Sequence, residues 1–339
     1  MLNDLKNLCL IDGISGDEGR VRDYIISRIK DKCTYSVDPM GNILAFKKGK
    51  NSPKNKVMLS AHMDEVGFIV TYICDNGFIK FTNVGGVDPK VALGRAVVIG
   101  ENSIKGVIGH KAIHLCHGEE ETAVPKLDKL YIDIGAENKE EAEKYVSLGD
   151  SIHFISDYVE FGKNKIKAKA IDDRFGCAIM LKMIDSELKY DTNFAFLVQE
   201  EVGCRGGSAA VFSIRPDYAI VLEATTASDI SGVSDEDRVC VQGKGAVVSF
   251  MDRSTVYNRD LFKKAFALAK EKNIPIQPKT TVAGGNDAGA IHKACSGVYT
   301  IAVSLPCRYI HSGTSVGDKA DMQACYDLAV ALCEDYANA

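Results

Sequence analysis

The sequence of 339 residues lacks the features that mark several classes of protein. It contains no tryptophan, and no two of its 11 cysteines are spaced C-x-x-C. An odd number of cysteines, many in apolar runs such as those around Cys74, Cys177 and Cys240, predicts buried free thiols rather than disulfides or a cysteine-rich zinc site. No stretch approaches the ~20 apolar residues of a membrane span, and the N-terminus lacks the pattern of a secretion signal. These absences predict a cytoplasmic protein with no membrane partner.

The charge is close to balanced, with 41 Lys and Arg against 46 Asp and Glu and a net charge of -5. Without a long basic run, neither nucleic acid nor an anionic membrane is expected as the main partner. The chain also lacks a His-Glu-x-x-His zinc helix, a phosphate-binding loop and a Gly-x-Ser-x-Gly nucleophile motif. With 46% hydrophobic residues, its composition is that of an ordinary globular protein of one large or two smaller domains.

Two kinds of pattern along the chain predict one domain inserted into another. Residues 1–65 read as a helix followed by two strands, and Ser15-Gly16-Asp17-Glu18 looks like the capping box of a helix over 15–32. Closely spaced β-type runs then follow, which is typical of a small barrel or sandwich. These runs are 67–73, 77–82, 96–99, 103–108, 130–134, 151–154 and 166–168.

Beyond Asp172 the pattern returns to alternating helices and strands. The strands at 194–198 and 218–222 are apolar throughout, as expected for a sheet that helices cover on both faces. We therefore expect an α/β domain made of residues 1–65 and 169–339, with a β-rich domain at 66–168 inserted between the two pieces.

Polar side chains gather at the predicted carboxyl ends of these strands, where open α/β sheets bind their ligands. They are His62, Asp64, Asp172, Asp173, Glu200, Glu201, Glu223 and His311. Carboxylates packed together at one edge repel one another, and a pair of divalent metal ions bridged by one carboxylate would compensate them. Any one of these residues alone would be an ordinary hydrogen-bonding or solvated group; the joint pattern is what indicates a metal site. The remaining five histidines are interpreted as ordinary residues.

Motifs along almost the whole chain resemble those of the M42 metallo-aminopeptidases, a family related to glutamyl aminopeptidases and tetrahedral peptidases. Each motif is weak alone, but all of them occur in the same order as in the family. They are His62-Met63-Asp64-Glu65-Val66-Gly67, Val84-Gly85-Gly86-Val87-Asp88, Ile132-Asp133-Ile134-Gly135-Ala136, Asp172-Asp173-Arg174-Phe175-Gly176-Cys177, Gln199-Glu200-Glu201-Val202-Gly203, Gly284-Gly285-Asn286-Asp287-Ala288-Gly289 and Arg308-Tyr309-Ile310-His311-Ser312.

The resemblance implies a role for each site residue. Asp172 would bridge two metal ions. His62 and Glu223 would complete one metal site, and Glu201 and His311 the other. Glu200 would act as general base on the metal-bound water, and Asp64 would hold the ring of His62 in its tautomer. Position 223 is more usually Asp in the family, which leaves the denticity and metal preference of that site open.

The expected reaction is removal of N-terminal residues from peptides by water that two metal ions activate. Carboxylate, imidazole and water ligands suit Zn²⁺ or Co²⁺, and also Mn²⁺. The resemblance further implies a mixed central sheet flanked by helices in the peptidase domain. It also implies that the small β-barrel-like insert mediates dimerisation, and that the dimers assemble into a tetrahedral dodecamer.

Two other functions compete with this prediction. A glycoside hydrolase would need two carboxyl groups ~5–9.5 Å apart and no metal, which leaves His62 and His311 unexplained. The absence of tryptophan also removes the usual large platform on which sugars stack. A non-catalytic assembly protein of the same fold would be expected to have lost at least one residue of the site.

The preferred N-terminal residue stays open. A basic residue near the site would favour acidic substrates, and an apolar pocket would favour Leu or Met. Arg205 and Arg308 could supply the basic group, or both could be structural.

Overall fold

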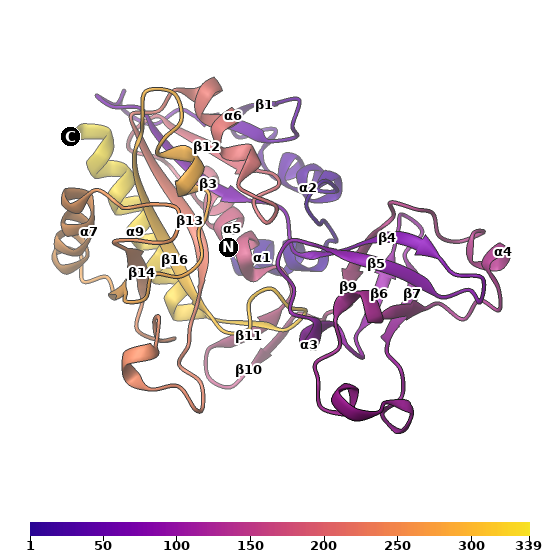
Figure 1. The fold of residues 1–339 in the computed structure, drawn as a ribbon. Coiled ribbons are helices and arrows are strands. Elements are labelled where there is room, and N and C mark those ends of the chain that lie inside the picture. Colours follow the sequence, from indigo (N-terminus) through magenta and orange to yellow (C-terminus); the bar gives the residue numbers. More distant parts are fainter.

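The computed structural model describes residues 1–339 apart from the side chain of Glu119. Figure 1 shows a large body built around a sheet and a smaller lobe at its side. The sheet has eight strands. Six of them take part in parallel pairs, four around its centre and two at one edge, and antiparallel pairs complete it. In spatial order they are β1 (Thr34–Val37), β2 (Ile43–Lys47), β12 (Thr192–Leu197), β3 (Val57–His62), β13 (Tyr218–Thr226), β16 (Tyr299–Cys307), β14 (Ala246–Ser249) and β15 (Ile276–Lys279). The predicted mixed sheet is therefore confirmed.

Helices cover both faces of this sheet because successive strand residues point to opposite sides. On β3, Val57 and Leu59 belong to the large core, whereas Met58 belongs to the core on the other face. The large core also contains side chains from α1 (Leu2–Leu10), α2 (Gly19–Ile29), α5 (Ile171–Asp185), α7 (Arg259–Glu271) and α9 (Lys319–Asn338). The opposite core contains side chains from α6 (Arg205–Ile214) and α8 (Ala288–Ile291).

The smaller lobe is a closed barrel of six antiparallel strands with its own apolar core. The predicted β-barrel is therefore confirmed, and two short helices, α3 (Pro89–Ala92) and α4 (Lys139–Ala142), lie between its strands in the chain. Around the barrel the strands are β4 (Gly67–Ile73), β5 (Ile79–Val84), β8 (Tyr131–Asp133), β7 (Ile104–Gly109), β6 (Ala96–Ile99) and β9 (Ser151–Phe154).

A third, small sheet ties the end of the insertion back to the large body. Here β11 (Lys165–Ala168) pairs with β10 (Val159–Phe161) on one side and with β17 (Ser315–Asp318) on the other. Because β17 leads directly into α9, the segment that follows the barrel pairs with the C-terminal part of the chain.

One local prediction is wrong. The helix predicted from residue 15 begins at Gly19, and no side-chain hydrogen bond caps it. The hydroxyl of Ser15 instead donates to a carboxylate oxygen of Asp64, 2.6 Å away.

Within the described residues, no helix is both long enough and apolar enough to cross a lipid bilayer.

Candidate metal centre at the carboxyl edge of the sheet

The seven predicted site residues meet at one edge of the central sheet. His62 ends β3, Glu223 lies near the end of β13, and Glu200 and Glu201 follow β12. These strands run parallel to one another and to β16, so their carboxyl ends reach the same edge. The remaining three residues arrive from loops or helix starts: Asp64 after β3, Asp172 at the start of α5, and His311 after β16.

Three buried side chains form the first group that could hold a cation: His62, Asp172 and Glu223. The Nε2 atom of His62 lies 3.4 Å from Oδ1 of Asp172 and 3.5 Å from Oε1 of Glu223. One ligand atom from each residue falls within 4.8 Å of the others, so one ion could contact all three.

A second group shares Asp172 and adds Glu201 and His311. The Nε2 atom of His311 lies 3.6 Å from Oδ2 of Asp172 and 3.4 Å from Oε2 of Glu201. The two oxygens of Asp172 therefore face different groups, Oδ1 toward His62 and Oδ2 toward His311. This is the arrangement that a carboxylate bridging two metal ions requires.

Two buried carboxylate oxygens of the site have no hydrogen-bond partner within the described part of the chain. Among the described atoms, Oδ1 of Asp172 and Oε2 of Glu223 accept no hydrogen bond. Burial, together with the charge of Asp172, raises the pKa of Glu223 and of Glu201 well above the usual range. Divalent cations would relieve both the desolvation and the repulsion. The mixed imidazole and carboxylate donors suit Zn²⁺, Co²⁺ or Mn²⁺, and so the residues fit a pair of such ions.

The imidazoles and carboxylates of the site shift one another's pKa values. Burial would lower the pKa of His311, but the nearby carboxylates of Asp172 and Glu201 raise that pKa to about 9. Burial would likewise raise the pKa of Asp172, but His311 and His62 hold it well below the usual range. The two imidazoles and the carboxylate of Asp172 between them thus favour one another's charged forms.

Asp64 contacts both the ring of His62 and the backbone of Glu200 and Glu201. The Nδ1 atom of His62 lies 3.0 Å from the backbone oxygen of Asp64 and 3.4 Å from its Oδ1 atom. The carboxylate of Asp64 also accepts hydrogen bonds from the backbone N–H groups of Glu200 and Glu201, each 3.1 Å long. Asp64 therefore contacts the His62 ring, as the resemblance implied, and also anchors the Glu200–Glu201 backbone, which we did not predict.

Glu200 lies beside both groups without belonging to either. Its Oε2 atom is 4.0 Å from Nε2 of His62, and its Oε1 atom accepts a hydrogen bond from the thiol of Cys204 at 3.4 Å. Burial and the charges of Asp172 and Asp64 raise the pKa of Glu200. A carboxylate with a raised pKa is suited to proton transfer near neutral pH.

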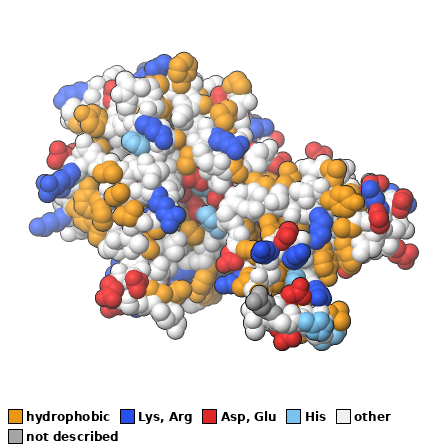
Figure 2. Space-filling model, in the orientation of Figure 1, with side chains coloured by type: hydrophobic (Ala, Val, Ile, Leu, Met, Phe, Trp, Pro, Cys, Tyr) orange, Lys and Arg blue, Asp and Glu red, His pale blue; other side chains and the backbone are white. Residues whose placement is uncertain are grey.

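These residues open into a cleft of about 690 Å³. Asp172, Glu200, Glu201, Glu223 and His311 lie in its wall. In Figure 2, acidic side chains and a histidine are visible together in the hollow between the large body and the barrel lobe. The wall also contains Lys279 at the end of β15, which sequence reasoning did not single out.

A third cluster with ligand-type side chains, Asp12, Glu65 and His153, already contains a cation. The ammonium of Lys169 lies 2.6 Å from carboxylate oxygens of both Asp12 and Glu65. This cluster is therefore a buried ion-pair network, in line with the interpretation of His153 as an ordinary residue.

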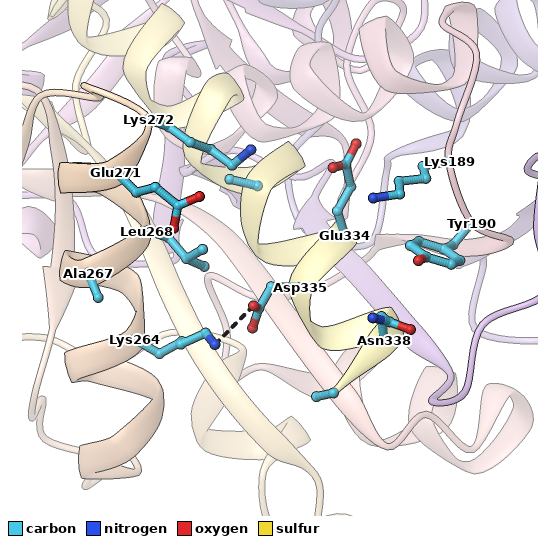
Figure 3. Close-up of a pocket in the computed structure, with 12 residues that line it drawn as sticks. Lys189, Tyr190, Lys264, Ala267, Leu268, Glu271, Lys272, Glu334, Asp335 and Asn338 are labelled. Carbon is cyan, nitrogen blue, oxygen red and sulfur yellow. Dashed lines mark ion pairs between the residues drawn. The ribbon is translucent and has the colours of Figure 1, made fainter.

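Another pocket, of about 490 Å³, lies between α7 and the C-terminal half of α9 (Figure 3). Lys189 and Tyr190 line it and precede β12, which places it at the opposite end of that strand from Glu200. Its wall contains both lysines and carboxylates, and Nζ of Lys264 lies 3.0 Å from Oδ1 of Asp335. Nothing in this pocket resembles the convergent site at the other edge of the sheet.

Comparison with known proteins agrees with this geometry. The sequence model of the family described as M42 glutamyl aminopeptidase matches residues 41–328. A protein of Acetivibrio thermocellus whose name places it among the aminopeptidases is 40% identical over 338 residues, covering 98% of both chains. The TET1 peptidase of Pyrococcus horikoshii, described as able to assemble into a tetrahedron or a large octahedral shell, has a TM-score of 0.86 and 34% identity, covering 98% of both chains.

One solved structure with the same fold has a different name. A protein of Thermotoga maritima called an endoglucanase has a TM-score of 0.81 and 36% identity, covering 98% of this chain and 97% of its own. Both the match over most of the chain and the aminopeptidase name of the relative with 40% identity point to peptide hydrolysis instead. The chain therefore belongs to the M42 family of aminopeptidases, which are hydrolases.

Proposed function

We propose that the protein is an aminopeptidase that uses two divalent metal ions and removes N-terminal residues from peptides. The observation that carries this proposal is the position of Asp172, whose two oxygens face two separate groups of ligand-type side chains. His62 and Glu223 would hold one ion with Asp172, and Glu201 and His311 the other. When bound, the two ions would lower the pKa of a water molecule and polarise the carbonyl group of the scissile peptide bond.

Glu200 would carry the proton in this reaction. Its carboxylate lies in the cleft wall near both groups, and its raised pKa suits a group that alternates between base and acid. Oε2 would take a proton from the attacking water and then give it to the nitrogen of the leaving amine. Asp64 would keep this carboxylate in place through its hydrogen bond to the backbone N–H of Glu200.

The acidic wall would also explain why the enzyme acts at chain ends. The free α-amine of a peptide is a cation, and the carboxylates Glu200, Glu201 and Glu223 line the cleft. A peptide bond in the middle of a chain has no such charge to place there. The enzyme would therefore be an exopeptidase rather than an endopeptidase.

Removal and return of metal tests this function. We expect chelator-treated protein to lose release of p-nitroaniline from aminoacyl-p-nitroanilides, and Zn²⁺, Co²⁺ or Mn²⁺ added singly to restore it. The restored rate should exceed the metal-free rate by about 10³-fold or more, because several kcal/mol of transition-state stabilisation is lost with the ions. Metal content measured by mass spectrometry should reach two ions per subunit at full activity.

Other outcomes would favour the competing functions. Release that is unaffected by complete metal removal would contradict the proposed chemistry. No release with any metal, from folded protein that binds two ions, would favour a non-catalytic assembly protein. Hydrolysis of a β-glucan in the absence of metal would favour a glycoside hydrolase.

We also propose that the barrel lobe mediates self-association into dimers and, through them, a tetrahedral dodecamer of 36.8 kDa subunits. Apolar side chains are exposed on this lobe, among them Val107, Ile113 and Leu115, and Ile113 is 66% exposed. Exposed apolar side chains of this kind favour a protein contact. The assembly of the TET1 peptidase of Pyrococcus horikoshii supports the same proposal.

A charge placed on this surface should disrupt the assembly. We expect multi-angle light scattering to show a large oligomer for the unaltered protein and smaller species for Ile113→Asp. Phe212→Asp, which puts the same charge on exposed α6 of the large body, is the matched control for the barrel surface. A monomer for the unaltered protein would contradict the proposal, and equal masses for the protein and the Ile113 variant would place the contact elsewhere.

A further inference from the structure

The backbone that follows β12 is held by side chains rather than by a neighbouring strand. Beyond Leu197, the last residue of β12, four successive backbone N–H groups each donate to a side-chain oxygen. For residues 198–201 in order, the acceptors are Oδ1 of Asn42 at 3.0 Å, Oε1 of Glu18 at 3.1 Å, and Oδ1 and Oδ2 of Asp64 at 3.1 Å each. This segment carries the proposed base and one proposed metal ligand, so its position decides where both lie.

Gln199 has a backbone conformation that needs such support. Its φ is 57°, in the left-handed region that residues with a side chain seldom adopt. A residue other than glycine keeps this conformation only where its surroundings impose it. On the far side of the turn, the backbone N–H of Arg205 donates to the carbonyl oxygen of Gln199 at 3.1 Å. The left-handed turn directly precedes Glu200, and therefore helps to set the direction of that side chain.

Glu18 supplies the hydrogen bond at this strained residue. Its side chain is buried, and its Oε1 atom accepts from the backbone N–H groups of Gln199 at 3.1 Å and of Gly16 at 2.9 Å. Its backbone oxygen accepts from the N–H of Arg22 at 2.9 Å, so its main chain begins α2 although its side chain does not cap that helix. The carboxylate therefore connects the start of α2 to the turn after β12.

The loop that carries Glu18 is itself fixed beside the candidate site. Ile14 forms an isolated parallel bridge with Glu65, and the hydroxyl of Ser15 donates to the carboxylate of Asp64 at 2.6 Å. One loop thus reaches the turn after β12 in two ways, directly through Glu18 and indirectly through the bond of Ser15 to Asp64.

Of the three acceptor residues, Glu18 is the one whose contribution can be separated from the metal groups. Asp64 also lies 3.4 Å from the ring of His62, and Asn42 also donates to the backbone oxygen of Gly206 in α6 at 3.2 Å. The two N–H groups that Glu18 accepts belong to residues outside both metal groups. Glu18 is also not among the residues of the cleft wall, so it would not touch the substrate.

We propose that Glu18 is a positioning residue, which places the carboxylate of Glu200 for proton transfer by accepting the backbone N–H of Gln199. This inference rests on the proposed aminopeptidase function. The effect is geometric, because a misplacement of ~1 Å in an active site can cost about 10²-fold in rate. Loss of the Glu18 carboxylate should therefore lower kcat and leave KM nearly unchanged.

Two variants of Glu18 test this role in the metal-loaded enzyme, with the aminoacyl-p-nitroanilide that the unaltered enzyme hydrolyses fastest. Glu18→Ala removes the acceptor, and we expect kcat to fall by about 10- to 100-fold while KM changes by less than about threefold. Glu18→Gln keeps an oxygen that can accept both N–H groups, so its kcat should stay within about threefold of the unaltered value. Both variants should hold two metal ions per subunit, because no ligand is altered.

Hydrogen–deuterium exchange of the metal-free protein gives a measurement that does not depend on activity. We expect the amides of residues 199–201 to exchange about tenfold faster in Glu18→Ala, because a hydrogen bond that protects them is lost. In Glu18→Gln they should exchange as in the unaltered protein. Asp4→Ala is the matched control, since this buried carboxylate of α1 accepts from Arg28 at 2.7 Å and from Tyr24 at 3.0 Å. It should lower the unfolding temperature but change neither kcat nor the exchange of these amides.

The outcomes separate this inference from the function on which it rests. No release of any amino acid by unaltered protein that holds two metal ions would overturn the aminopeptidase proposal itself. Unchanged exchange of these amides in Glu18→Ala would overturn the role of Glu18 and leave the aminopeptidase in place. Equal losses of kcat in Glu18→Gln and Glu18→Ala would overturn that role too, because the charge and not the hydrogen bond would then matter. So would loss of metal in Glu18→Ala, which would place the effect on Glu201 instead of on the base.

Discussion

Replacing Asp172 with asparagine is expected to lower kcat/KM by about 10³-fold or more, because several kcal/mol of metal-derived stabilisation depends on this one side chain. Oδ1 faces His62 and Oδ2 faces His311, at 3.4 and 3.6 Å. Asparagine has nearly the same shape, but it offers one oxygen and an amide nitrogen that only donates. It could therefore complete one of the two groups at most.

The metal content gives the more direct measurement of this effect. We expect two ions per subunit for the unaltered protein and at most one for Asp172→Asn. Added metal should also raise the unfolding temperature of the variant less than that of the unaltered protein. The reason is that stabilisation by a ligand grows with the logarithm of its concentration divided by its Kd, and the variant should have the higher Kd. Asp31→Asn removes an exposed carboxylate from the turn after α2 and serves as the control. Two tightly held ions in Asp172→Asn would contradict the bridging role.

Most of the fold could be predicted from the sequence because its patterns are local. The apolar strands that precede His62, Glu200 and Glu223 are buried on both faces, and continuous apolar runs predict such strands. The barrel could be predicted from closely spaced short strands in the same way. The pairing of β11 with β17 could not be predicted, because these segments are about 150 residues apart in the chain. Nothing in the sequence of either strand identifies the other as its partner.

The same distinction between local patterns and distant contacts applies to the candidate site. Ligand-type residues at strand ends are visible in the sequence, because parallel strands bring their carboxyl ends to one edge. The contacts that hold these residues are not visible. Ser15 looked like a helix cap, yet its hydroxyl donates to Asp64, from 49 positions away. Nothing in the stretch Gln277-Pro278-Lys279 distinguishes a lysine in the cleft wall from a lysine on the surface of an edge strand.

Glu200→Gln should affect the chemistry while leaving the metal in place. The side chain belongs to neither metal group, so the variant should bind two ions per subunit as the unaltered protein does. Glutamine cannot accept a proton from water or return it to the leaving amine. We therefore expect kcat to fall by about 10² to 10⁴-fold, which is the usual contribution of general acid–base catalysis.

The control and the pH profile separate this role from a structural one. Glu271→Gln removes an exposed carboxylate at the end of α7 and should leave kcat unchanged. In the unaltered enzyme the acid limb of kcat against pH should reflect the raised pKa of Glu200, and the residual activity of the variant should lack this limb. A variant that lost metal along with activity would make Glu200 a ligand, and one that kept full activity with two ions would require another base. Since Asp172→Asn should lose metal and Glu200→Gln should keep it, the pair of variants distinguishes the residue that holds the ions from the residue that moves the proton.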